Sequence, residues 1–143
     1  MAHHTRYGEK GIDHWRGVVY RSPGTLVVWD CLEGEGVHEL ELNWQCNGEI
    51  EEFSSGGGPG TLIMAPLDAQ ITIAGGRVSR QRGMLDPPRG WLAPQYGRLT
   101  PITTLTATAT TFLPHEFVTV VELAAWSGPG VTRDVEIFRS WLP

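Results

Sequence analysis

Residues 13–32 read DHWRGVVYRSPGTLVVWDCL, and this stretch decides the fold class. Two runs of valine and aromatic residues flank Ser22-Pro23-Gly24, a strong turn signal. The pattern predicts an antiparallel hairpin. Side chains on a strand point alternately to the two faces of its sheet, so Trp15 and Trp29 share one face and Asp30 lies on the other.

Three polar residues fall on the face that carries Asp30. If the turn is centred on its proline, Arg16 lies directly opposite Asp30, and His14 is a diagonal neighbour within reach. A second turn at 33–35 leads into a strand on which we expect His38 to lie opposite Asp30. A slip of one residue in either turn would send one partner to the other face.

A carboxylate inside an apolar layer needs partners, because an unpaired buried charge is costly. Two interpretations follow. In the first, His14, Asp30 and His38 bind a metal ion. In the second, Arg16 and Asp30 form a structural salt-bridge cluster together with His14.

The rest of the chain reads as strands too. Eighteen glycines and ten prolines interrupt it too often for long helices. We predict a single all-β domain over residues 1–143, an antiparallel, jelly-roll-like β-sandwich of two stacked sheets. Residues 103–111 alternate threonine with apolar residues and predict a half-buried strand with a hydroxyl face. The predicted strands are 13–21, 25–32, 37–45, 61–65, 70–74, 77–80, 99–112, 117–123 and 131–138.

Charge and composition exclude several classes of partner. The formal net charge is −5 and no basic stripe is present, which argues against nucleic acid and anionic membranes. No apolar run approaches the roughly 18 residues of a membrane span. Cys31 and Cys46 do not oppose each other in the simple hairpin register, so we expect free, semi-buried thiols.

One non-strand segment, 83–98, is rich in aromatic residues and proline. Trp91 and Tyr96 could stack on sugar rings, and Arg89 could meet a carboxylated sugar. The alternative is that the aromatic side chains pack against the end of the sandwich or against another domain.

The order of short motifs resembles the C-terminal β-domain of the heparinase II/III family of polysaccharide lyases. Three stretches carry the resemblance, and together they span most of the chain. They are His14-Trp15-Arg16 followed by Val27-Val28-Trp29-Asp30 and Gly34-Glu35-Gly36-Val37-His38, then Gly90-Trp91 through Tyr96-Gly97, then Leu113-Pro114-His115-Glu116-Phe117-Val118-Thr119.

The resemblance implies a fragment of a larger enzyme. In such lyases a helical toroid precedes the β-domain and carries most of the residues that catalyse β-elimination at a uronic acid. The missing toroid and an acidic polysaccharide would be the partners, and the parent protein would be periplasmic or secreted.

The resemblance also implies a zinc ion held by a His, an Asp and a second His. His14 and Asp30 match the first two ligands. The second His is expected in or after the strand around Trp44, where this chain has no histidine. His38 is an available substitute, and Cys46 a weaker one.

These observations lead to three hypotheses. The first is an accessory β-domain that shapes the substrate cleft of a lyase and is inactive alone. The second is an autonomous, non-catalytic carbohydrate-binding module that uses Trp91, Tyr96 and the arginines Arg80, Arg82 and Arg89. The third is a small metal-dependent enzyme built on His14, Asp30 and His38.

Overall fold

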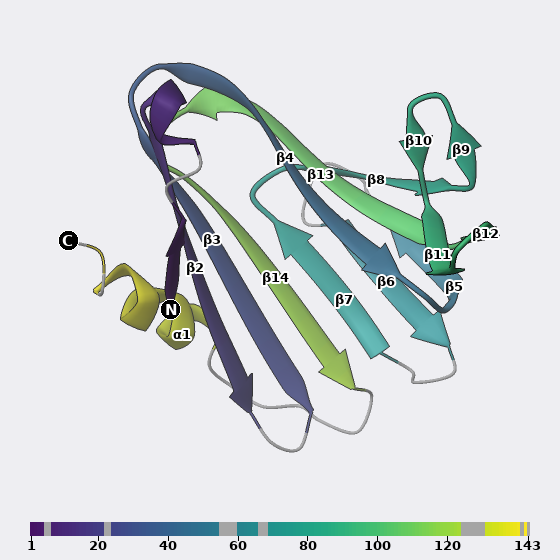
Figure 1. Cartoon of the computed structure of the whole chain (residues 1–143). Coiled ribbons are helices and arrows are strands. Elements are labelled where there is room, and N and C mark those ends of the chain that lie inside the picture. Colours follow the sequence, from purple (N-terminus) through teal and green to yellow (C-terminus); the bar gives the residue numbers. More distant parts are fainter. Residues whose placement is uncertain are drawn as a thin grey trace.

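The computed structural model describes residues 1–4, 7–21, 24–54, 60–65, 69–123, 131–140 and 142. Two antiparallel sheets stack face to face, and one short helix lies on the outside of the larger sheet (Figure 1). The all-β class and the stacked antiparallel sheets are therefore confirmed. No helix of the described part is long and apolar enough to cross a membrane.

The large sheet has the strand order β1-β2-β3-β14-β7-β6-β5, and the small sheet has the order β4-β13-β8. Two short ribbons, β9–β10 and β11–β12, are inserted between β8 and β13. The strands are β1 Ala2–His4, β2 Ile12–Arg21, β3 Thr25–Gly34, β4 Val37–Cys46, β5 Glu49–Ser54, β6 Gly60–Ala65, β7 Ala69–Ala74, β8 Arg77–Arg82, β9 Met84–Leu85, β10 Pro88–Arg89, β11 Trp91–Gln95, β12 Arg98–Pro101, β13 Thr103–Phe112 and β14 His115–Leu123. The helices are the short 3-10 helix Gly8–Lys10 and α1, Val131–Arg139.

The chain passes between the two sheets four times, from β3 to β4, from β4 to β5, from β7 to β8 and from β13 to β14. The first, third and fourth of these corners meet at one end of the stack. Leu113 N donates to Gly36 O at 3.1 Å, and His115 Nε2 lies 2.6 Å from Gly75 O. Gly75 has a φ of +100°, and a Cβ there would lie 2.1 Å from Glu116 O, so only glycine fits this corner.

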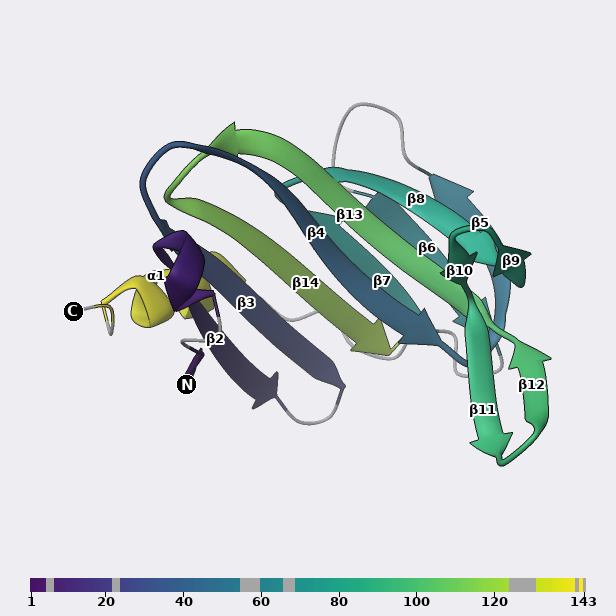
Figure 2. The same cartoon turned by 45° about the horizontal axis from the view of Figure 1, so that its top comes forward.

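The main core lies between the sheets. The small sheet covers β14, β7 and β6, whereas β2 and β3 extend beyond it (Figure 2). The buried side chains that share this core include Leu40, Leu42, Ile73, Leu105 and Phe117. As a result, Val18 and Tyr20 on the uncovered part of β2 stay 53% and 65% exposed.

A second core lies between the outer face of the large sheet and α1. Trp29 is fully buried there, and its ring stacks on Phe138 at a centroid distance of 5.6 Å. The expectation that Trp15 and Trp29 lie on the face away from Asp30 is correct, because Trp15 pairs with Cys31 and packs against this second core.

The helix α1 corrects one prediction, because residues 131–138 were expected to form a strand. Their alternation of apolar and polar residues also fits a helix. In the helix, Asp134, Val135 and Phe138 are buried on one face while Ile137 is 37% exposed. Helical spacing therefore describes this segment better than a period of two.

Two more boundaries differ from the sequence-based expectation. The predicted strand 99–112 is broken at Ile102, whose N–H donates to Gly90 O at 2.9 Å instead of pairing in the sheet. The segment 83–98, expected to lack strands, contains β9, β10 and β11. The strands β1 and β5 were not predicted.

The largest correction concerns β4. We expected β3 and β4 to form a hairpin, but β3 pairs with β2 and β14, and β4 pairs with β13 in the other sheet. Leaving one sheet for the other lets the apolar face of β4 cover that of the large sheet. The first turn behaves as expected. Residues 22 and 23 lie outside the described part, but Arg21 pairs with Thr25 on either side of them.

Candidate functional site

Asp30 lies at the centre of a polar cluster on the inner face of the large sheet. Its side chain is 2% exposed. Arg16 donates from Nε to Oδ1 at 2.6 Å and from Nη2 to Oδ2 at 3.1 Å, because β2 and β3 pair Arg16 directly with Asp30. His14 Nε2 approaches Oδ1 at 2.7 Å from the diagonal position.

The cluster keeps Asp30 ionised. Burial is the largest single influence and raises the pKa of its carboxyl. The hydrogen bonds from His14 and Arg16 and the charge of Arg16 outweigh that influence, so the pKa lies below its ordinary value. A charge this deeply buried is tolerated only because both of its oxygens are bound.

Trp44 reaches the same cluster from the small sheet. The guanidinium carbon of Arg16 lies 5.9 Å from the centroid of the Trp44 ring, within the range of a cation–π contact. The indole N–H of Trp44 donates to Thr119 Oγ1 at 3.0 Å, and Thr119 is fully buried. These contacts fix the two sheets to each other beside Asp30.

His38 does not lie opposite Asp30, and that expectation is wrong. Asp30 faces Phe117 of β14, whereas His38 pairs with Thr111 in the small sheet. The His38 Nε2 lies 2.8 Å from Glu35 O, so this nitrogen is used within its own turn. The error comes from the hairpin register assumed for β4.

The donor set does not fit the zinc site that the resemblance implies. Within the described ranges, no group of three His, Cys, Asp or Glu side chains is arranged to bind a metal ion. Zinc needs free lone pairs at about 2.0–2.3 Å. Here the guanidinium of Arg16 binds both oxygens of Asp30, and His14 Nε2 is directed at one of them.

The cluster forms the floor of a cleft of about 300 Å³ at the open edge between the sheets. The 3-10 helix and its flanks close one side of this cleft. No sequence signal pointed to those residues, because they reach the site only through the fold. The cleft is lined from the large sheet by His14, Asp30, Leu32 and Phe117, from the small sheet by His38, Leu40 and Leu42, and from the N-terminal segment by Tyr7 and Lys10.

A second hollow, of about 450 Å³, lies between the inserted ribbons and the outer face of the small sheet. Arg89 and Trp91 line it, as do Asn43 and Gln45 of β4. Tyr96 does not line it, and its side chain is fully exposed at the tip of the β11–β12 ribbon. Two of the three residues proposed for sugar binding are thus brought together, and the third is not.

The comparisons with known proteins bear on the fold. No family model and no curated protein sequence matches the chain. A solved heparinase III with methylated lysines superposes with a TM-score of 0.64 at 16% identity, over 87% of this chain and 19% of that one. The heparan sulfate lyase HepC from Pedobacter heparinus gives 0.61 at 14% identity, over 85% and 19%, and another heparinase III gives 0.60 at 15%, over 82% and 18%.

The chain shares its fold with part of heparinase III. It spans about a fifth of the length of those structures. The resemblance that the motifs indicated is therefore confirmed at the level of the fold. The sequence identity of 14–16% carries no activity across by itself.

Proposed function

We propose that this chain is the accessory β-domain of a polysaccharide lyase that cleaves uronic-acid polysaccharides by β-elimination. In this role it borders the substrate cleft of a helical domain. The shared fold with about a fifth of heparinase III is the observation that carries the proposal. A periplasmic or extracellular location of the parent protein belongs to the same proposal.

The inner cluster supports an accessory role more than a catalytic one. A β-elimination needs a base for the proton beside the carboxylate, an acid for the leaving oxygen and a group that neutralises the carboxylate. Arg16, a candidate for neutralisation, binds Asp30 through two nitrogens, and His14 is also directed at Asp30. Both side chains hold the fold together, so we expect this chain alone to be inactive.

Two measurements test the proposal. The first is to sequence the DNA upstream of Met1 and the neighbouring genes, where we expect a helical domain to be encoded. That domain should co-purify with this chain when the two are expressed together. The second is the ultraviolet absorbance of unsaturated product when the isolated chain is incubated with heparan sulfate. Turnover by the isolated chain, or the absence of any encoded helical partner, would overturn the accessory role.

A second candidate function is an autonomous carbohydrate-binding module. The hollow lined by Arg89 and Trp91 favours it, since an aromatic wall beside polar groups suits a sugar ring. This function needs no helical partner. It is distinguished from the first by whether a helical partner is encoded and co-purifies with this chain.

A further inference from the structure

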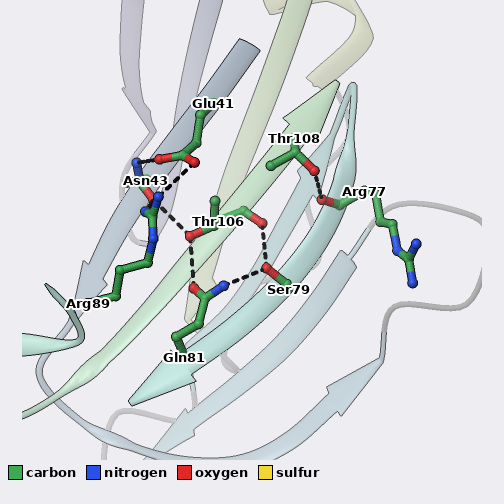
Figure 3. A network of polar contacts seen from close by, with 8 residues as sticks. All are labelled: Glu41, Asn43, Arg77, Ser79, Gln81, Arg89, Thr106 and Thr108. Carbon is green, nitrogen blue, oxygen red and sulfur yellow. Dashed lines mark hydrogen bonds and ion pairs between the residues drawn. The ribbon is translucent and has the colours of Figure 1, made fainter. Parts of the chain in front are cut away.

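The outer face of the small sheet carries an ordered row of amides and hydroxyls. Thr106 Oγ1 lies 2.8 Å from Asn43 Oδ1 and 2.9 Å from Gln81 Oε1 (Figure 3). One register step along, Thr104 donates to Gln45 Oε1 at 2.9 Å. Thr104 and Thr106 are almost fully buried although they face outward.

Arg89 is held at the edge of this row by two contacts. Its Nη1 donates to Asn43 Oδ1 at 3.1 Å, and its Nη2 pairs with Glu41 at 2.8 Å. Glu41 in turn accepts from Asn43 Nδ2 at 2.7 Å (Figure 3). A guanidinium has five N–H groups, so these two contacts fix the orientation of the Arg89 guanidinium and leave three of its N–H groups available.

The opposite wall of the hollow is apolar. Trp91, Leu85, Pro88 and Leu99 line it from the inserted ribbons. The indole N–H of Trp91 donates to Met84 O at 2.7 Å, which fixes the plane of the ring. Leu85 and Leu99 stay 83% and 64% exposed, so this wall presents apolar surface that a ligand could cover.

Charge is distributed unevenly along the chain. Residues 77–101 carry five arginines and one aspartate, whereas the whole chain has a net charge of −5. Of these arginines Arg89 lines the hollow, and a guanidinium held in place can bind a carboxylate even when the protein as a whole is acidic.

We propose that this hollow is a subsite for one carboxylate-bearing sugar unit. The C–H face of the ring lies on Trp91, its hydroxyls bond to Gln45 and Asn43, and its carboxylate meets the remaining donors of Arg89. The Nε2 of Gln45 has no partner among the described residues and is free for this contact. The assignment deepens the proposed function, since it names where the β-domain contacts the glycan.

The test uses the isolated chain and a tetrasaccharide of alternating glucuronate and N-acetylglucosamine. Titration of the isotope-labelled wild-type chain is followed by NMR. We expect the side-chain amide signals of Asn43 and Gln45 and the indole signal of Trp91 to shift with one common dissociation constant. Shifts confined to the cleft around His14, or no shift at millimolar ligand, would overturn the subsite.

Matched variants separate a built site from general charge attraction. Arg89→Gln should weaken binding at least tenfold and abolish the preference for the tetrasaccharide over its carboxyl-reduced form. Arg77→Gln removes the same charge, but the Arg77 side chain points away from the network (Figure 3), so it should change binding less than twofold. Equal losses in both variants would overturn the site.

Aromatic variants make the same comparison for the apolar wall. Trp91→Ala should lose binding, whereas Tyr96→Ala, at a fully exposed tyrosine, should keep it. Because Trp91→Ala could unfold the ribbon, Gln45→Ala serves as a second variant on an exposed position and should weaken binding at least threefold. These assays need no helical partner, so the subsite and the accessory role can fail independently.

Discussion

Arg16 and Asp30 face each other on adjacent strands, and the guanidinium binds both oxygens of the buried carboxylate at 2.6 and 3.1 Å. Asp30 is enclosed while the Arg16 side chain is 41% exposed. The ion pair therefore runs from the buried carboxylate of Asp30 to the partly exposed guanidinium of Arg16. Loss of Asp30 would remove the carboxylate partner of Arg16, and loss of Arg16 would leave Asp30 with His14 alone.

Replacing Asp30 by asparagine should destabilise the domain. Breaking a buried ion pair costs about 3–5 kcal/mol, and the partial exposure of Arg16 places this one at or below the lower end. Urea unfolding measures the loss. Asp13→Asn is the control, since it removes the same charge from an exposed position of the adjacent strand β2, where the carboxylate lies 3.1 Å from His3 Nε2. Equal effects of the two substitutions would contradict the role of the cluster.

The same pair predicts a dependence of stability on pH. The pKa of Asp30 is lower in the folded state than the unfolded value of about 3.9, so its contribution is complete above that value. It is lost as the pH falls through the lower folded pKa. The stability gap between wild type and Asp30→Asn should therefore narrow below about pH 4 in urea titrations. A gap that stays constant down to the acid transition would refute this. Wild type must be compared with Asp30→Asn because Glu116 also contributes to the pH dependence of stability. The pKa of Glu116 is lowered too, chiefly through its hydrogen bond with Arg139.

Gly17 should be intolerant of a side chain. A Cβ at this position would lie 2.4 Å from Cδ1 of Phe138, where α1 packs on the large sheet. We expect Gly17→Ala to cost about 1–3 kcal/mol, as overpacking does in other cores. Thermal unfolding checks it. Adding Phe138→Leu should cost less in the Gly17→Ala background than in wild type, and strict additivity would show that the two residues do not compete for space.

The two cysteines should react slowly with thiol reagents in the native state. Both are buried and unpaired. Burial raises the pKa of Cys31 to about 12 and raises that of Cys46, so little thiolate forms near neutral pH. Labelling with a chromogenic disulfide should be slow in buffer and complete within minutes in urea. Rapid labelling without denaturant would show that the structure around one of the two cysteines opens easily.

Zinc should not bind stoichiometrically at Asp30. Arg16 occupies the carboxylate, and His38 is directed at its own turn. Equilibrium dialysis followed by elemental analysis of the chain should find less than one zinc per molecule at that site. One tightly held zinc that disappears in Asp30→Ala would show that the cluster rearranges around a metal.

The inserted segment 83–98 shows what local patterns could not supply. Its aromatic and proline content marked it as unusual, but the partners of Arg89 lie more than forty residues away on β4. No turn or period in the sequence relates those two segments. The polar wall of the second hollow therefore appears only when β4 and β13 pair.

The sequence alone determined the β2–β3 hairpin, its register and the position of Arg16 opposite Asp30, because a short turn and a period of two are local properties. It also determined the hydroxyl face of β13. Only the tertiary structure decided that β4 leaves the large sheet, that residues 131–139 form a helix and that His38 pairs with Thr111 in the small sheet instead of lying opposite Asp30. Those choices depend on which apolar faces cover each other, and that is settled by contacts between residues far apart in the chain.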